Sequence, residues 1–222
     1  MPVTRSRRSP PRAKQKNPAA KPGVQLSAHR AWQRMLSGRR LDLLDPSPLD
    51  IEIEDIAHGL ARVARWNGQT IGAHIFSVAQ HTLLVEAIAR RRVGTLDRRL
   101  GLALLLHDAP EYVIGDMITP FKAVIGDSYK STEKRLLGAI HVRFGLPREL
   151  PSEIVALIKA ADHSAAYLEA TRLAGFALEE AERFFGPAPT LFAGLERDYM
   201  TPWPASIAEK QYLERFATLA DE

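Results

Sequence analysis

The stretch DRRLGLALLLHDA, residues 97–109, decides the fold of this chain. Its leucines surround the axis of the expected helix instead of forming one stripe, and a helix that is apolar on all sides is normally the central, buried one. His107 and Asp108 stand at the end of this apolar run. The sequence therefore predicts that these two polar side chains lie at the end of the best-protected helix of the protein.

The rest of the chain also has apolar residues at helical spacing, from about residue 27 onward. Only the short run LDIEIEDI alternates as a strand would. Segments such as DPSPLD, GLPRELPS and FGPAPT carry the Pro and Gly residues that stop helices. We therefore predict an all-α helical bundle around a central buried helix. The predicted helices cover residues 27–37, 54–66, 73–91, 97–109, 129–144, 152–183 and 205–219.

The charge is distributed unevenly along the 222 residues, a length that suits one ordinary domain. The chain carries 30 basic and 26 acidic residues, but seven of the basic ones lie in residues 1–22, which contain no acid. Without them the balance is 23 basic against 26 acidic residues, a net charge of −3. We predict a disordered basic tail over residues 1–24 and a single domain over residues 25–222. A solvated extension is preferred here over a nucleic-acid-binding arm.

The composition also excludes several classes of protein. The absence of cysteine excludes a disulfide scaffold, a thiolate metal site and a cysteine nucleophile. The sequence shows neither the apolar region of a secretory signal nor a run long enough to span a membrane. We therefore expect a cytoplasmic protein with no membrane partner and no nucleic-acid partner. Amphipathic surface in the late helices leaves a homodimer open, because an interface and a core stripe give the same pattern.

His81 lies in the expected helix SVAQHTLLVEAIAR, where it shares one stripe with Val78, Val85 and Ile88. It is therefore predicted to face the core. A buried neutral histidine satisfied by a carbonyl is the alternative. His74 falls on the same stripe, but seven residues of helix would separate the two by roughly 10.5 Å. Since each ligand of a metal lies about 2 Å from it, only one of the two histidines can bind a given ion.

Asp162 lies in IVALIKAADHSAAYLEA on one ridge with Ile154 and Ile158. A carboxylate on an apolar face is costly when it is left unpaired. It needs a cation, a set of donors or a proton. No arginine or lysine stands on the same ridge within one turn, so a local ion pair is disfavoured.

These inward-facing residues share one simple explanation, which is a bound divalent metal. Imidazole nitrogen with carboxylate oxygen suits Mn, Fe, Co, Ni or Zn, and helical bundles hold such sites between facing helices. We expect one such ion, with open positions for water and substrate. A structural bundle in which the polar residues merely pair is the alternative. The predicted ligands are His81, His107, Asp108 and Asp162; His29, His58, His141 and His163 are expected at the surface or in packing.

The order SVAQH, LLLHDAPEYVIGD and KAADHSAAYLEA resembles the HD-domain metal-dependent phosphohydrolases, whose ligands follow the order H…HD…D. The finer pattern RW, H, HDxxE, GD and TPxK is similar to the bacterial 5′-deoxynucleotidase branch, over roughly residues 50–175. The resemblance implies an HD-domain-like bundle and the same four metal ligands. It also implies that Glu111 and Asp116 handle water and leaving group, and that Arg65 and Trp66 bind substrate. Pro110 and the segments 39–50 and 184–204 depart from the pattern.

Glu111 follows His107 by four residues, so a helix continuing through Pro110 would place both on one face, where Glu111 could orient water or carry its proton. If Pro110 ends the helix, only the resemblance supports this role. Asp116, in the turn IGDM, would hold the substrate or protonate the leaving oxygen. These roles belong to the hydrolysis of a phosphomonoester.

A phosphate dianion needs positive charge beyond the metal, and Arg65 and Lys122 are the candidates; a solvated lysine is the alternative for Lys122. Trp66 would stack on a base or sugar, or belong to the core. We predict a divalent-metal-dependent phosphohydrolase whose small-molecule substrates are (deoxy)nucleoside 5′-monophosphates. Hydrolysis of a dinucleotide, a cyclic nucleotide or an alarmone is the nearest alternative. A non-catalytic metal- or nucleotide-binding regulator is the other.

Overall fold

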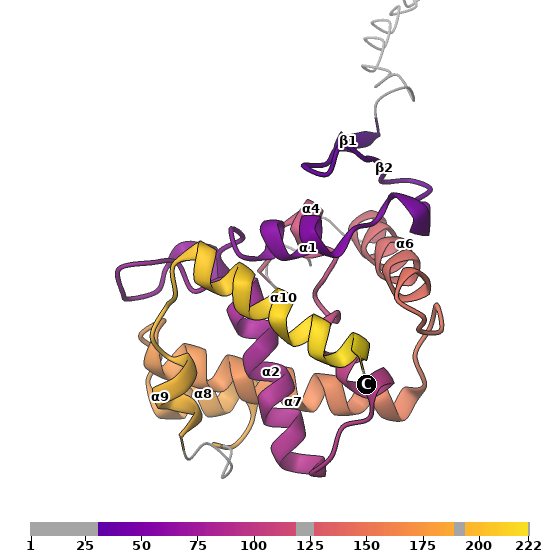
Figure 1. Cartoon of the computed structure of the whole chain (residues 1–222). Coiled ribbons are helices and arrows are strands. Elements are labelled where there is room, and N and C mark those ends of the chain that lie inside the picture. Colours follow the sequence, from indigo (N-terminus) through magenta and orange to yellow (C-terminus); the bar gives the residue numbers. More distant parts are fainter. Residues whose placement is uncertain (1–30, 119–126, 189–193, 222) are drawn as a thin grey trace, which may run out of the picture. The chain divides into compact units, whose positions relative to one another are not determined.

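The structure, a computed structural model, describes residues 31–118, 127–188 and 194–221. The predicted basic tail lies outside these ranges, as does Lys122. Helices make up the described fold apart from one short two-stranded hairpin (Figure 1), which confirms the all-α prediction. The α-helices are α1 Ile53–Leu60, α2 Val78–Val93, α3 Arg98–Leu105, α4 Glu111–Ile114, α6 Asp127–Arg143, α7 Ser152–Arg172, α8 Leu178–Phe185, α9 Leu195–Tyr199 and α10 Ala205–Asp221.

Helix α2 packs against α1, α3, α7, α9 and α10, and Figure 1 shows α10 (yellow) crossing in front of it. The helix begins where the Ser77 hydroxyl accepts a hydrogen bond from the Gln80 amide, a standard N-terminal cap. It ends at Gly94, whose φ of 80° favours glycine. Because helices surround it, α2 is buried along most of its length and can carry a polar residue out of contact with water.

Helix α3 is the predicted apolar helix, and its burial is as expected. The helix begins where the Asp97 carboxylate accepts a hydrogen bond from the Leu100 amide at 2.8 Å, which is an N-terminal cap. It packs between α2, α7 and α10. Leu102, Leu104 and Leu105 are each at most 1% exposed, so the leucines do surround its axis. The helix ends at Leu105, four residues earlier than predicted, and a turn carries the following residues.

The helix predicted over residues 27–37 is wrong in its described part. Strand β1 (Trp32–Arg34) pairs antiparallel with β2 (Arg40–Asp42), and Gly38, with a φ of 89°, lies in the connecting turn. Contacts distant in sequence favour the hairpin, because the Ser37 amide donates to the buried Asp55 carboxylate of α1 at 2.9 Å. The expected strand-like run LDIEIEDI instead forms a 3-10 turn, η2 (Pro48–Asp50), and the start of α1.

Other predicted helices begin or end at different residues. The expected helix 54–66 stops at Leu60, and the chain then forms a 3-10 turn, η3 (Arg65–Gly68). Helix α2 starts at Val78 instead of residue 73. The long helix expected over residues 152–183 is divided into α7 and α8 at Gly175, whose φ of 77° no helix adopts. Among the described helices, none combines the length and apolar character needed to cross a bilayer.

Candidate metal centre

Backbone carbonyls at the end of α3 orient His107, the histidine of the HD pair formed by His107 and Asp108. The last carbonyls of a helix lack partners within it. Here the Leu104 carbonyl accepts from His107 Nδ1 at 2.8 Å, and the Leu105 carbonyl accepts from the buried Tyr212 hydroxyl of α10 at 2.8 Å. Since a carbonyl only accepts, His107 carries its proton on Nδ1 and presents the lone pair of Nε2.

A hydrogen bond at Nδ1 also orients the imidazole of His81. It is fully buried on α2, as the stripe of apolar residues predicted. Its Nδ1 donates to the Glu169 carboxylate of α7 at 2.5 Å, which leaves the Nε2 lone pair available. Two imidazoles from different helices therefore turn their Nε2 atoms toward Asp108, and each Nε2 offers a lone pair to an ion when it carries no proton.

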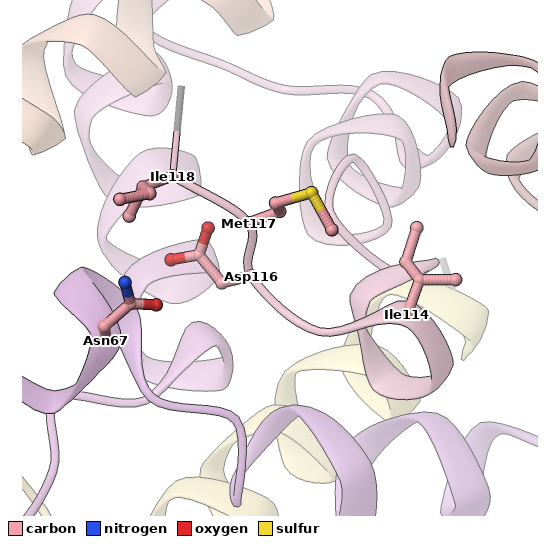
Figure 2. A pocket seen from close by; sticks show the side chains of 5 residues that line it. All are labelled: Asn67, Ile114, Asp116, Met117 and Ile118. Atoms are coloured by element: carbon pink, nitrogen blue, oxygen red, sulfur yellow. The ribbon is translucent and has the colours of Figure 1, made fainter. Parts of the chain in front are cut away.

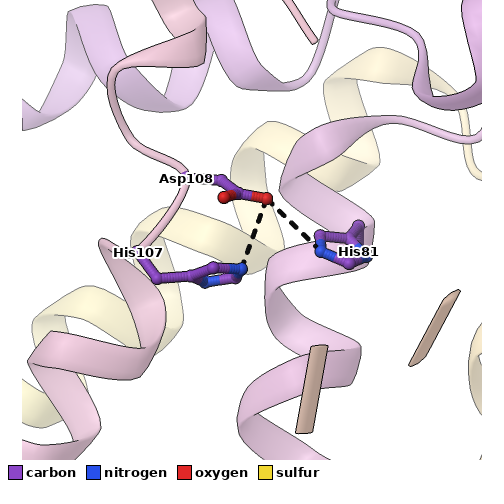
Figure 3. A group of neighbouring side chains, drawn as sticks. All are labelled: His81, His107 and Asp108. Atoms are coloured by element: carbon purple, nitrogen blue, oxygen red, sulfur yellow. Dashed lines mark ion pairs between the residues drawn. The ribbon is translucent and has the colours of Figure 1, made fainter. Parts of the chain in front are cut away.

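Figure 3 shows Asp108 between the two histidines. One of its oxygens, Oδ2, lies 3.3 Å from His107 Nε2 and 3.4 Å from His81 Nε2. The ligand atoms of these three residues all lie within 4.8 Å of one another. Ligands that each stand about 2 Å from one ion are roughly 3–4 Å apart, so the spacing suits a metal. Neither buried Nε2 has a hydrogen-bond partner within the described chain. The donor set fits a divalent ion.

Asp162, the fourth predicted ligand, lies beside this group with Oδ1 3.2 Å from His81 Nε2. It comes from α7, so the residues derive from three different parts of the chain. Its carboxylate points inward to His81, as predicted, but the side chain is 35% exposed and therefore only partly buried. The position at the rim leaves it accessible to solvent and to a ligand.

The charges of the centre influence one another strongly. Burial and Arg65 oppose protonation of His81, yet the nearby carboxylates, Glu169 foremost, prevail and raise its pKa well above the usual value. For Asp108, burial opposes ionisation, but the two histidines outweigh it and hold its pKa well below the ordinary range. Protons and a metal ion therefore compete for the imidazole nitrogens, and metal binding should release protons.

Glu169 contacts the candidate centre, and the sequence reasoning did not single it out. It is fully buried, and its Oε2 accepts from Trp66 Nε1 at 2.8 Å and from Arg65 Nε at 3.2 Å. Burial raises its pKa, but Arg65 and His81 outweigh this and lower the pKa to about 2. The available signal was its place in the otherwise apolar run SAAYLEA, two helical turns after Asp162.

Arg65 and Trp66 both reach the centre through this carboxylate. Arg65 is 14% exposed on its side chain, and its pKa is raised because nearby carboxylates outweigh the effect of burial. Trp66 packs against Phe176 and Phe185, with ring centroids 5.5 and 5.9 Å away. Of the two roles left open for Trp66, these contacts are those of packing. Its φ of 57° is unusual for a residue other than glycine.

A pocket of about 420 Å³ lies beside the turn that follows α4. Figure 2 shows Asn67, from the RWNG turn, facing Asp116 and Ile118. Asp116 Oδ2 also lies 3.3 Å from Arg65 Nη1, so a chain of polar contacts leads from the pocket wall through Arg65 and Glu169 to His81. The lining residues are Asn67, Ile114, Asp116, Met117 and Ile118. The volume falls within the range of small-molecule pockets.

Glu111 does not follow His107 on a continuous helix. Pro110 precedes the short helix α4, and the HD pair lies in the turn before it. Glu111 is nonetheless only 3% exposed, and its amide is bonded to the Asp108 carbonyl at 3.0 Å. The turn, not helical spacing, keeps it near the pair. His74 is exposed and precedes α2, so it does not share a helical stripe with His81.

The remaining histidines divide between surface and packing. His163 is exposed on α7, and His58 pairs with Glu209 at 3.5 Å. His141 is buried near the Arg148 carbonyl, where burial lowers its pKa. His29 lies outside the described residues. None of the three described ones belongs to the group formed by His81, His107 and Asp108.

Comparison with known proteins agrees with the geometry. Residues 58–180 match the family described as 5′-deoxynucleotidase YfbR-like. The chain belongs to this family. The match confirms the resemblance to the HD-domain phosphohydrolases, a family type that implies a hydrolase with a divalent metal.

Two relatives extend beyond the family match. An uncharacterized protein of Rhodobacter capsulatus is 63% identical over 167 residues, which cover 75% of this chain and 85% of the relative. The uncharacterized protein YfdR of Escherichia coli is 27% identical over 172 residues, covering 78% and 86% of the two chains. Both relatives therefore match three quarters or more of this chain.

Proposed function

We propose that this YfbR-like protein is a divalent-metal-dependent phosphomonoesterase that converts (deoxy)nucleoside 5′-monophosphates to nucleoside and phosphate. The observation that carries the proposal is the pair of buried Nε2 atoms of His81 and His107. They face one oxygen of Asp108 at 3.4 and 3.3 Å without a hydrogen-bond partner in the described chain. The pocket of about 420 Å³ beside Asp116 supports the proposal, because polar contacts through Arg65 and Glu169 connect it to His81.

The ion would be held by His81, His107, Asp108 and Asp162, and Mn, Co, Fe, Ni and Zn all suit this set. When bound, such an ion supplies a Lewis acid that activates water and polarises a phosphoryl oxygen. The set contains no sulfur ligand. It consists of His81, His107 and Asp108 together with the partly exposed Asp162, and four such ligands would leave room for substrate. This arrangement is typical of a catalytic site more than of a closed structural one.

Glu111 is proposed to hold the attacking water and take its proton, since it is buried one short turn after the HD pair. Arg65 is proposed to orient the phosphate. Within the described chain its guanidinium donates to Glu169 and Asp116, which leaves further donors of the planar fork for phosphate oxygens. Asp116 lines the pocket, and this favours contact with the nucleoside.

The test is phosphate release by the Mn²⁺- or Co²⁺-loaded protein. Deoxynucleoside and ribonucleoside 5′-monophosphates would be compared with a cyclic nucleotide, a dinucleotide and an alarmone. We expect the monophosphates to be the best substrates. His81→Ala and Asp162→Ala should lose activity and bound metal, while His163→Ala, at the exposed neighbour of Asp162, should lose neither. Full activity and metal content in the first two variants would refute the proposal.

A further inference from the structure

Glu169 connects two parts of the site that the sequence places far apart. One of its oxygens, Oε1, accepts from Nδ1 of His81 on α2. The other, Oε2, accepts from Arg65 Nε at 3.2 Å and from Trp66 Nε1 at 2.8 Å. Its partners are 88, 104 and 103 residues away, and the side chain is fully buried. Every one of these contacts requires Glu169 to accept.

We propose that Glu169 is a positioning residue that fixes both halves of the centre at once. On one side it holds the proton of His81 on Nδ1 and directs Nε2 toward Asp108 and Asp162. On the other side it holds Arg65 in the orientation that reaches Asp116. The second half rests on the proposed function, because it assigns the phosphate to Arg65; the first half needs only a metal.

The chemistry of the acceptor makes this role specific to a carboxylate. Both oxygens of Glu169 accept hydrogen bonds, whereas the side-chain amide of a glutamine has one accepting oxygen and one nitrogen that only donates. In Glu169→Gln the amide nitrogen must face either the imidazole or the Arg65 and Trp66 donors. In the first case His81 moves its proton to Nε2 and loses the lone pair that would bind metal. In the second case Arg65 and Trp66 lose their acceptor. In either case one set of residues, His81 or the pair Arg65 and Trp66, loses the hydrogen bond that orients it.

The competing explanation is that Glu169 only neutralises the buried charge of Arg65. A structural ion pair of this kind would affect stability without affecting the imidazole tautomer. Glu86 offers a matched control, because it is also buried and pairs with Arg90 (2.6 Å) and Arg215 (2.7 Å) without contacting a histidine in the described chain. It lies on α2, the same helix as His81.

The experiment compares Glu169→Gln with Glu86→Gln in full-length protein. Four quantities are measured: the melting temperature, the Co²⁺ dissociation constant from visible absorption, the dissociation constant of inorganic phosphate, and the His81 tautomer from ¹⁵N-histidine spectra. The His81 signals are assigned by their loss in His81→Gln. We expect both variants to melt at lower temperature. Only Glu169→Gln should show a change at the centre. If the amide nitrogen faces His81, Co²⁺ should bind about 10- to 100-fold more weakly. If it faces Arg65 and Trp66, the protein should lose its binding of inorganic phosphate.

Equal Co²⁺ and phosphate affinities in the two glutamate variants would overturn the proposal. The native protein provides a second test that needs no folded variant. With Zn²⁺ added, its His81 should carry a proton on Nδ1 and none on Nε2. A His81 whose metal-bound nitrogen is Nδ1 would also overturn the proposal. Since none of these readouts involves hydrolysis, a failure of the proposed reaction would be recognised separately.

Discussion

Arg65 Nη1 lies 3.3 Å from Asp116 Oδ2, although 51 residues separate them in sequence. The contact joins the RWNG turn to the wall of the pocket that Asp116 lines. Since the same guanidinium donates through Nε to Glu169, one arginine connects the pocket to His81. The guanidinium suits such a bridge, because its planar fork holds several donors in fixed directions.

Replacing Arg65 by lysine should therefore be far from conservative. A lysine ammonium keeps the charge but cannot donate to Glu169 and Asp116 in the same geometry. Loss of a charged hydrogen bond costs about 1.5–3 kcal/mol, so we expect kcat/KM to fall about 10- to 100-fold, with a rise in KM. Steady-state kinetics of phosphate release measure both parameters.

Arg62→Lys is the control for this substitution. Arg62 stands three residues earlier and pairs with Glu209 on the surface, with a side chain 44% exposed. Because exposed ion pairs contribute little, Arg62→Lys should keep nearly normal kinetics. If Arg65→Lys behaves in the same way, Arg65 does not bind the phosphate.

Glu111→Gln should separate metal binding from chemistry. The carboxylate is buried after His107 and Asp108 but does not belong to the group formed by His81, His107 and Asp108, so the variant should bind Co²⁺ as the native protein does. A lost general base typically costs about 100- to 10,000-fold in rate. Activity and Co²⁺ content would be measured side by side, with Glu54→Gln, at an exposed position on α1, as the control. Loss of the metal would instead make Glu111 a ligand.

Metal removal should lower the melting temperature of the native protein. A ligand at 100 times its dissociation constant stabilises by about 2.7 kcal/mol, and a domain of this size gains roughly 2–4 °C per kcal/mol. We therefore expect chelation to lower the melting temperature by about 5–10 °C, and Co²⁺ to restore it. In Asp162→Asn the shift should shrink, whereas His163→Asn should show it in full. An undiminished shift in Asp162→Asn would remove that residue from the ligand set.

The part of the centre that the sequence predicts depends on local patterns. The stripe of Val78, Val85 and Ile88 predicts the burial of His81, because helical periodicity and the Ser77 cap act within a few residues. The leucines of α3 are a local pattern of the same kind, because leucines on all sides of a helix predict that the helix is buried. The hairpin at Trp32–Asp42 could not be found in this way, since a contact to Asp55, distant in sequence, helps to hold it.

Glu169 shows why the remainder of the centre escapes sequence reasoning. A glutamate in a helix is by default a surface residue. Only the tertiary structure brings it to Arg65 and Trp66, from more than 100 residues away, and these donors offset the cost of burying its charge. Asp162 shows the limit of the periodicity, because its apolar ridge predicts that the carboxylate points inward but not that 35% of the side chain remains exposed.

The packing of α1 against α4 gives a test of how tightly Glu111 is positioned. A Cβ atom added to Gly59 of α1 would lie 2.7 Å from Tyr112 Cβ and 3.0 Å from the Tyr112 carbonyl oxygen. Tyr112 is the residue after Glu111, so α4 must move to accept Gly59→Ala. Overpacking of this kind costs about 1–3 kcal/mol. A displacement of about 1 Å in the site can cost about 100-fold in rate, so we expect kcat to fall 10- to 100-fold.

Gly101→Ala provides the matched comparison, because it adds the same methyl group to a buried helix glycine. Its Cβ would lie 2.5 Å from Leu219 Cδ2, the end of a flexible side chain that can rotate away. We expect a similar loss of thermal stability but nearly normal kcat, and unchanged Co²⁺ affinity in both variants. Equal kcat in Gly59→Ala and the native protein would mean that the position of α4 does not govern catalysis, and Glu111 would then have to act through a different contact.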